Sequence, residues 1–410
     1  MQDNGKKPAL RFKGFTDPWE QRKLGEIAVF SKGVGYSKND LCEEGTPIIL
    51  YGRLYTKYET CIFDVDTFVK EKAGGVYSKG GEVIVPASGE TAEDISIASV
   101  VVKPGILLGG DLNIVSPTAE YDSAFLALTI SSGATHKYLS SLAQGKSVVH
   151  LHNADIQSVS AKFPTKREQE KIHLLFGKID TLITLHQRKY EKLVNIKKSM
   201  LDKMFPQNGA SVPEIRFKGF TDPWEQRKLG EIAKEVVRND PASDAPIMMI
   251  TAGNGFIEQS DRYAFNNAGE SLKKYILLER GELAYNHGAS KLRPYGSCFA
   301  LTTVEKARIP FVYHCFSVEK SNPEFLSIEL NGANVENQLR KIVSSGARMD
   351  GLLNIAYSEY TEVTVQLPKK EEQDWIAKFF KHLDTLITLH QRKLEKLQNI
   401  KKSCLEKMFV

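Results

Sequence analysis

The chain has 410 residues, enough for two or three domains, and its hydrophobic fraction of 41% excludes wholesale disorder. It shows no signal peptide, no run of 18 apolar residues and no C-x-x-C pair among its five cysteines, which argues against membrane-spanning, disulfide-stapled and zinc-binding classes. We therefore expect a cytoplasmic protein with reduced thiols, whose net charge of +5 is unevenly distributed along the chain.

The first element in chain order is a frame that occurs twice. The segment Arg11 to Ala28 reads RFKGFTDPWEQRKLGEIA, and residues 216–233 repeat it without a change. Its Asp-Pro turn is followed by a tryptophan, Trp19 or Trp224, which we interpret as a buried packing anchor without chemistry.

A second matching block closes each half of the chain. The sequence DTLITLHQRK of residues 180–189 recurs at 384–393, and E-K-L, N-I-K-K-S and K-M-F follow in both copies. The two blocks repeat at offsets of 205 and 204 residues, far longer than a solenoid unit. We predict a tandem duplication of a domain-plus-helix module, with faint register in the inserts at Gly81-Glu82 and Gly281-Glu282.

The inserts between the matching blocks, 29–162 and 234–366, are unlike each other. Short β-branched runs bounded by Gly, Pro, Ser and Asn predict β-rich domains with polar loops. Side chains on such loops are suited to reading base edges, although any one of them is more often a solvated turn residue. The candidates for DNA contact are Tyr51, Arg53, Ser88, Glu90, Lys146, Ser147, Asn153, Asn254, Asn286, His287, Lys291, Arg293, Arg348 and Asn354.

Residues 166–205 and 369–410 predict two long helices of about 40 residues, each a rod of roughly 60 Å. Apolar residues alternate at spacings of three and four, which indicates the a/d seam of a coiled coil, and we expect the helices to pair antiparallel. The seam and partner-docking candidates are Ile179, Leu182, His186, Lys189, Leu193, Leu383, Leu386, His390, Lys393 and Leu397.

Each seam is interrupted once by a polar pair, His186-x-x-Lys189 and His390-x-x-Lys393. One interpretation is a titrating switch or a metal pair. The other, which we favour, is a polar layer that fixes the register of the helices, because one histidine per helix makes a poor metal site.

Charge separates the helices from the inserts. The two helical segments each hold ten Lys and Arg against five or six Asp and Glu, whereas the inserts carry −4 and −2. A free-standing DNA-binding protein usually presents a broad basic face. If these inserts contact nucleic acid, we expect local patches, with partners supplying much of the affinity.

The combination resembles the specificity (S) subunit of type I restriction–modification enzymes over essentially the whole chain. Three motifs carry the resemblance: R-F-x-G-F-x-x-x-W-x-x-x-x-L-G-E-I at Arg11 to Ile27 and 216–232, P-x-x-x-E-Q-x-x-I at 164–172 and 368–376, and the repeated D-T-L-I-T-L-H-Q-R-K. It implies an α+β fold with a pseudo-two-fold internal repeat, in which two β-rich target-recognition domains are separated by an antiparallel coiled coil. The domains would be 1–165 and 206–366, and the spacer helices 166–205 and 367–410.

The resemblance also implies a function. Each recognition domain would read one half of a bipartite, asymmetric target in double-stranded DNA, and the helices would set the gap between the halves. Two modification subunits would dock on the helices, and restriction subunits would join them. The cofactors S-adenosylmethionine, ATP and Mg would be used by these partners, and this chain would bind none and hold no catalytic residue. We attribute the identical frames to docking of the same partner twice.

Two alternatives come from other classes. The first is a fused methyltransferase–nuclease, and the second is a purely structural coiled-coil adaptor. The sequence contains no Walker lysine, G-x-S-x-G, H-E-x-x-H, N-P-P-Y or D-P-P-F, which argues against an enzyme.

Overall fold

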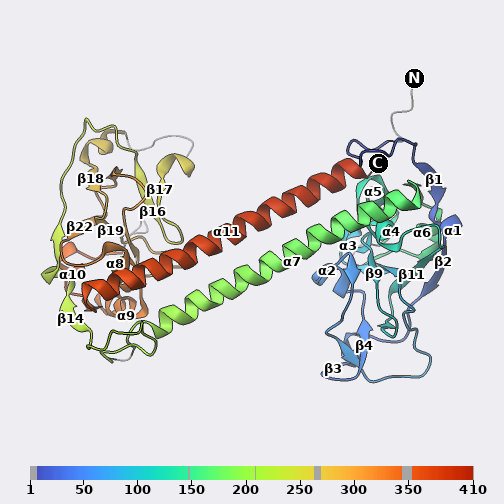
Figure 1. Ribbon diagram of the computed structural model, residues 1–410, viewed down its shortest axis with the longest axis horizontal. Helices are drawn as coiled ribbons and strands as arrows, with labels where there is room; N and C mark the ends of the chain where they lie inside the picture. The colour runs from blue at the N-terminus through green and yellow to red at the C-terminus, as the bar shows by residue number, and fades with distance from the viewer. Residues whose placement is uncertain (1–6, 146–147, 208, 263–268, 344–352, 410) are drawn as a thin grey trace. The chain divides into compact units, whose positions relative to one another are not determined.

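The computed structural model describes residues 7–145, 148–207, 209–262, 269–343 and 353–409 (Figure 1). The DNA-contact candidates Lys146, Ser147 and Arg348 lie outside these ranges.

The chain forms two compact units. Unit 1 comprises Met1–Arg188 and His390–Val410, and unit 2 comprises Lys189–Leu389. The boundary between the units falls inside the long helices α7 (Lys166–Lys203) and α11 (Lys370–Met408). Each unit therefore contains one globular domain, the beginning of one long helix and the end of the other.

The repeated frame builds the same base in both units. In unit 1, β1 (Glu20–Lys23) pairs antiparallel with β13 (Ser160–Phe163), the strand that leads into α7. In unit 2, β14 (Glu225–Lys228) pairs in the same way with β23 (Thr364–Leu367) before α11. The predicted tryptophan anchor is confirmed, since both rings are buried and meet a phenylalanine edge-on in their own unit.

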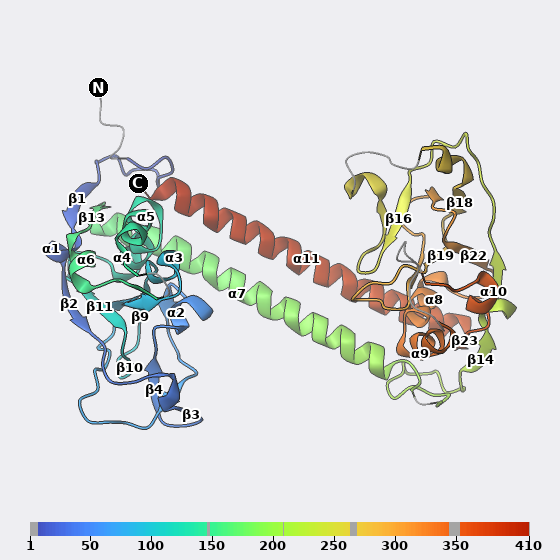
Figure 2. The same cartoon turned by 180° about the vertical axis from the view of Figure 1, so that it is seen from behind.

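Unit 1 has one main sheet in the order β2-β11-β7-β9-β5, in which only β9 and β5 run parallel. The helix α4 packs on β7 and β9, and it is buried from Ala124 to Ile130, so it forms the centre of the core (Figure 2). The elements are α1 (Leu24–Ile27), β2 (Ala28–Lys32), α2 (Arg53–Thr56), β5 (Cys61–Ile62), β7 (Glu82–Pro86), β8 (Ser88–Gly89), α3 (Ala92–Ile95), β9 (Ser99–Val101), β11 (Leu112–Pro117), α4 (Ser123–Ile130), α5 (Gly133–Leu142), β12 (Val149–His150) and α6 (Asn153–Ser158).

A second, smaller sheet in unit 1 has its own core. Its strands are β3 (Leu41–Cys42), β4 (Thr46–Ile49), β6 (Phe68–Val69) and β10 (Leu107–Leu108), in the order β10-β4-β6-β3. Tyr36, Ile48, Val69 and Leu107 fill the space behind it.

Unit 2 repeats the main sheet in part, in the order β15-β22-β19-β20, and adds two two-stranded pairs. The faint register at Gly81 and Gly281 is confirmed, because both glycines have a positive φ and each stands just before the equivalent strand, β7 or β19. The elements are β15 (Ala233–Glu235), β16 (Met248–Thr251), β17 (Gly255–Glu258), β18 (Ile276–Glu279), β19 (Leu283–Asn286), β20 (Ser297–Ala300), β21 (Lys306–Ile309), β22 (His314–Val318), α8 (Pro323–Leu330), α9 (Ala333–Ile342) and α10 (Tyr357–Tyr360).

The start of each long helix is locked to its domain by the repeated E-Q pair. The buried Glu168 receives a bidentate pair of hydrogen bonds from Arg11, and Glu372 receives the same pair from Arg216. The following glutamine closes the entry turn: Gln169 donates to the Pro164 carbonyl and accepts from the Asp122 N–H. Unit 2 repeats this with Gln373. Internal packing thus accounts for part of the identical frame, and docking of a partner remains a prediction for the rest.

The end of each long helix completes a core with its K-M-F sequence. Phe409 contacts Trp19, Phe125 and Phe176 in unit 1. In unit 2, Phe205 contacts the equivalent Trp224, Phe325 and Phe380. The backbone repeats this arrangement. In unit 1 the Leu10 N–H donates to the Lys407 carbonyl, and in unit 2 the Ile215 N–H donates to the Lys203 carbonyl.

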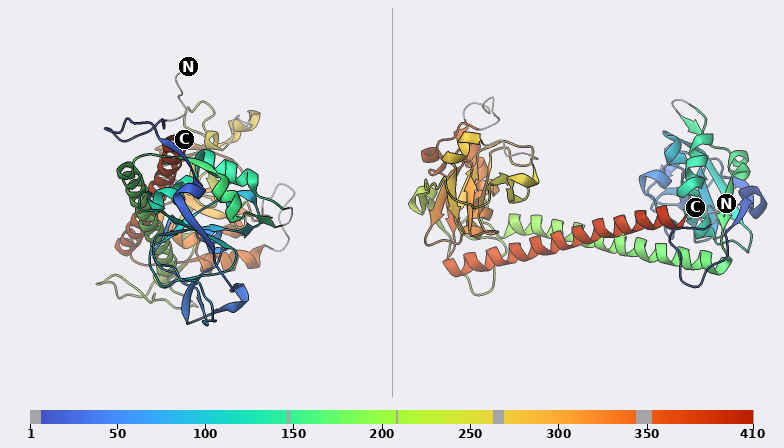
Figure 3. Two further views of the ribbon diagram at one scale, coloured as in Figure 1. Left: turned by 90° about the vertical axis from the view of Figure 1, so that its right-hand side faces the viewer. Right: turned by 90° about the horizontal axis from the view of Figure 1, so that it is seen from above.

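Within each unit the two long helices pair antiparallel, as predicted. Figure 3 shows the two helices running side by side in opposite directions. In unit 1, Lys401 binds Asp180 at 2.6 Å, and His186 meets His390 with their Nδ1 atoms 2.8 Å apart. In unit 2, Lys197 binds Asp384 at 2.5 Å, which is the repeat-equivalent of the pair in unit 1.

The observed apolar seam of each long helix differs from the predicted seam by one row of side chains along the helix face. Leu182 was predicted in the seam but is 43% exposed, and Lys189 and Lys393 are exposed as well. The less exposed side chains of α7 instead follow Ile172, Phe176, Ile179, Ile183, His186, Tyr190 and Leu193, and those of α11 follow Ile376, Phe380, Leu383, Ile387, His390, Leu394 and Leu397. Both rows satisfy spacings of three and four, so periodicity alone does not separate them.

The histidines alone therefore form the polar layer that was predicted as a His-Lys pair. Their facing ring nitrogens have the geometry of a register-fixing layer. Within the described ranges, no group of three or more His, Cys, Asp and Glu residues is placed to hold a metal ion.

Candidate nucleic-acid interface

Arg53 is not available to read bases. It was predicted on a loop, but it begins α2, and its buried guanidinium pairs with Glu59 at 2.8 Å and Asp66 at 2.6 Å. Two carboxylates and the Asp64 carbonyl accept from its Nη1 and Nη2 groups, whereas its buried Nε has no acceptor among the described residues. Arg53 is therefore a structural clamp of unit 1.

The predicted loop from Pro86 to Glu90 is for the most part strand. Ser88 is buried in β8, where its hydroxyl lies 3.0 Å from the His150 ring on the paired strand β12. Only Glu90 is exposed. The other two candidates of unit 1 are half-buried: Tyr51 lies beside Tyr55, and Asn153 begins α6 and donates to the Ser31 carbonyl.

His287, in unit 2, is a buried brace. Its Nδ1 lies 2.8 Å from the Leu353 carbonyl and its Nε2 lies 2.8 Å from the Val312 carbonyl, so both ring nitrogens are occupied by main chain. Its role as a base reader is contradicted by this burial. Asn354, one residue beyond Leu353, is exposed.

The structure brings the remaining candidates of unit 2 together on one surface. We define the hairpin–loop surface as residues 251–255, the turn between β16 and β17, and residues 287–296, the loop between β19 and β20. The Asn286 amide ties the two segments by donating to the Ile250 carbonyl at 3.2 Å. A side chain at Gly253 would meet Leu292 at 3.7 Å. Asn254 and Lys291 are exposed on this surface.

Arg293 stands at the base of the same loop. It is half-buried, and its Nη1 donates to the Asn331 carbonyl at 2.7 Å. Burial lowers its pKa, and Glu336 offsets this only in part. The surface thus presents cations and an amide side by side, a combination that suits phosphate and base-edge contacts.

Sequence reasoning missed Leu292, which is 66% exposed between Lys291 and Arg293. The signal was present as the run S-K-L-R between Gly288 and Pro294, where an apolar residue stands in a polar turn. The comparable connection in unit 1, after β8, instead presents Glu90, Glu93 and Asp94. The two domains therefore differ in charge at this place.

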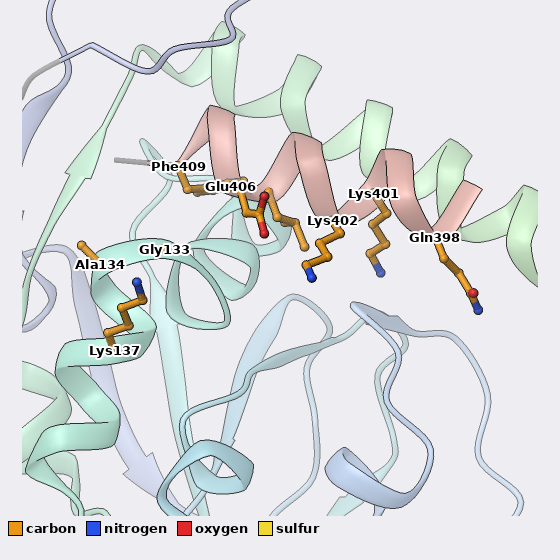
Figure 4. Close-up of a pocket in the computed structure, with 9 residues that line it drawn as sticks. Gly133, Ala134, Lys137, Gln398, Lys401, Lys402, Glu406 and Phe409 are labelled. Carbon is orange, nitrogen blue, oxygen red and sulfur yellow. The ribbon is translucent and has the colours of Figure 1, made fainter. Parts of the chain in front are cut away.

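A cavity of about 680 Å³ lies between α5 and the last turns of α11 in unit 1 (Figure 4). Leu405 and Phe409 give it an apolar side, and Lys137, Lys401 and Lys402 supply charge. Lys401 is already paired with Asp180. The helix lysines recur in unit 2 as Lys197 and Lys198, whereas α9 has Asn337 at the place that Lys137 takes on α5.

The long helices also expose apolar side chains outside the seam. Leu185 is 44% exposed on α7 in unit 1, and its repeat-equivalent Leu389 is 43% exposed on α11 in unit 2. Leu182 lies one turn before Leu185 on the same face. Internal packing does not account for the identity of these positions in both copies.

No helix within the described ranges combines the length and the apolar character that a membrane span needs.

Three comparisons with known proteins agree. Residues 16–195 match the family model described as the type I restriction modification DNA specificity domain. The type I restriction enzyme MjaVIII specificity subunit of Methanocaldococcus jannaschii is 22% identical over 420 residues, which cover 94% of this chain and 91% of the relative. The solved S subunit of a type I restriction–modification system from M. genitalium matches at a TM-score of 0.62 and 14% identity, covering 98% of this chain and 99% of that one.

Two unlike domains on a repeated frame of long helices make up the fold, and the solved S subunit shares it. Residues 16–195 thus carry the type I restriction modification DNA specificity domain, and the chain as a whole is similar to type I specificity subunits, which confirms the resemblance drawn from its motifs. Members of this family are in general recognition subunits rather than catalysts.

Proposed function

We propose that each globular domain reads one half of a bipartite DNA target, and that the paired helices set the gap between the halves. The observation that carries the proposal is the duplication itself: the frames are identical, whereas the domains differ in sheet order and in exposed charge. A symmetric scaffold with unlike readers is suited to an asymmetric target.

The proposal extends to two copies of a modification subunit, one docked on each copy of the exposed leucine face. Leu185 and Leu389 support it, since a surface that is identical, exposed and apolar in both units fits one partner bound twice. The lysine-rimmed cavity beside α11 would add a contact for acidic side chains of the partner in unit 1. Restriction subunits would join this complex.

The chemistry would then belong to the partners. S-adenosylmethionine would be used by the modification subunits, and ATP and Mg by the restriction subunits, while this chain supplies target choice. The hairpin–loop surface is the DNA contact that we assign to unit 2.

The proposed docking of two modification subunits is tested by measuring the number of modification subunits per chain with mass photometry. We expect two modification subunits on the native chain and one on each of the variants Leu185→Asp and Leu389→Asp, because a charge on an apolar contact is costly to bury. The matched control is Leu174→Asp: Leu174 is 54% exposed on α7, but the repeat has Lys378 in its place. Equal loss with all three variants would contradict docking on the repeated leucine face.

A further inference from the structure

The loop between β19 and β20 ends in a rigid tip. The Ser290 N–H donates to the Arg293 carbonyl at 3.0 Å, and the Arg293 N–H donates back to the Ser290 hydroxyl at 3.0 Å. These two bonds close a turn whose central residues are Lys291 and Leu292. The conformation of the tip is thus fixed before any ligand binds, which lowers the entropy cost of binding.

Arg293 lies at the base of this tip without a carboxylate partner. Among the described residues it forms no ion pair, Glu336 offsets its burial only in part, and its Nε is buried without a hydrogen-bond acceptor. A guanidinium does not give up its proton, so partial burial without a counter-ion is unfavourable. Arg53 in unit 1, whose Nε also lacks an acceptor, has the carboxylates of Glu59 and Asp66 on its two Nη groups. With Nη1 bonded to the Asn331 carbonyl and Nε buried, the Nη2 group is the donor of Arg293 left for an anion from outside the chain.

Leu292 adds an apolar group to this cationic tip. A single exposed leucine is ordinary on a protein surface. Here, however, the leucine stands between two cations on a closed turn, and it lies 3.7 Å from where a Cβ at Gly253 of the neighbouring hairpin turn would stand. A ligand that satisfies all three side chains has regularly spaced anions with apolar faces between them. Duplex DNA has this pattern, with phosphates flanking sugars and stacked bases.

We infer that the Lys291-Leu292-Arg293 tip is a DNA wedge. Lys291 and Arg293 contact phosphates, and Leu292 enters the groove and packs against a base step, which it partly unstacks. The inference rests on the proposed function, since it assumes that unit 2 binds DNA. It goes further in naming the contacting residues and in predicting a local distortion in only one half of the target. The acidic connection of unit 1, with Glu90, is unsuited to this role.

The test uses the full chain in complex with its modification subunit and a duplex that carries the target found by methylome mapping. Adenines in and beside both half-sites are replaced one at a time by 2-aminopurine, whose fluorescence rises on unstacking. We expect a rise at one step in one half-site. Leu292→Ala should abolish the fluorescence rise and weaken target binding roughly tenfold. Leu292→Met should keep both the rise and the native affinity.

Two further variants sharpen the test. Lys291→Ala should reduce the slope of log affinity against log salt by about 0.9 without abolishing the rise. The matched control is Val237→Ala, because Val237 is 72% exposed elsewhere in unit 2 and should change neither readout. None of these exposed residues should alter thermal unfolding.

The possible results distinguish a failure of the proposed function from a failure of the proposed wedge. If the native complex shows no affinity for its methylated target, the proposed function fails. If the native complex binds and Leu292→Ala leaves affinity and fluorescence unchanged, the wedge is wrong and the function stands. If Leu292→Ala weakens only the binding of the modification subunit, the tip is a protein contact, which also overturns the wedge.

Discussion

Phe409 tests whether the end of α11 completes the core of unit 1. Its ring stacks on Phe125 with centroids 5.4 Å apart and meets Trp19 and Phe176 at 6.5 and 6.0 Å. Truncating a buried phenylalanine to alanine costs about 3–5 kcal/mol, and aromatic pairs of this kind contribute about 0.5–1.5 kcal/mol each to such losses. We therefore expect Phe409→Ala to lower the free energy of unfolding of unit 1 by about 3–5 kcal/mol.

The assay is urea unfolding followed by tryptophan fluorescence in two reporter backgrounds. Trp224→Phe with Trp375→Phe leaves Trp19, which is buried in unit 1. Trp19→Phe with Trp375→Phe leaves Trp224, which is buried in unit 2. Phe409→Ala should shift the Trp19 transition, and the repeat-equivalent Phe205→Ala should shift the Trp224 transition. Both transitions are compared within their own background.

The control is Ile400→Ala, since Ile400 lies on α11 but is exposed, and it should change stability by no more than about 0.5 kcal/mol. If Phe409→Ala shifts the Trp19 transition no more than Ile400→Ala does, the end of α11 does not belong to the core of unit 1. A Phe205→Ala variant that shifts the Trp19 transition instead would contradict the assignment of the α7 end to unit 2.

Three further predictions concern stability and the helices. Arg11→Met should destabilise unit 1 by about 3–5 kcal/mol because Glu168 is left buried and unpaired, whereas Arg11→Met with Glu168→Met should recover most of the loss in urea titrations; an additive double variant would refute the pairing. Burial raises the pKa of Glu329 to about 7, so the folded state favours its protonated form, and unit 2 should lose stability as pH rises from about 5 to 8. In unfolding curves followed by Trp224, Glu329→Gln should flatten this dependence of stability on pH. The same slope of stability against pH in the native chain and in Glu329→Gln would refute the role of Glu329. Inserting one helical turn within 184–198 and a matching turn within 388–402 should lengthen the gap in the methylated target and leave both half-sites intact, and altered half-sites with an unchanged gap would contradict the role of the helices.

The parts of the fold that could be predicted depend on local sequence. The duplication, the Trp19 anchor and the two long helices follow from patterns that lie within one segment of chain. Gly81 and Gly281 were recognisable because a positive φ before a strand is a local requirement. The seam was shifted because two apolar rows run along one helix face, and only the packing of the partner helix selects between them.

The DNA-contact candidates were harder to predict because a polar side chain on a loop becomes structural when a distant group satisfies it. Arg53 is held by Asp66, and His287 is held by the carbonyls of Val312 and Leu353. Neither partner is visible from the loop sequence itself. Leu292 was hard to predict for the opposite reason, because a leucine in a loop carries no polar group that indicates base contact. The hairpin–loop surface emerged only when the structure brought residues about 40 apart in sequence together.

The central claim is that the shared frame fixes the geometry of the target and the unlike domains choose its bases. It is tested most directly by mapping the methylome of a host that expresses the modification subunit with a chain in which residues 234–366 are replaced by the corresponding insert of another specificity subunit. We predict that one half-site changes, while the other half-site and the gap stay the same. A change in both half-sites, or in neither, would contradict the claim.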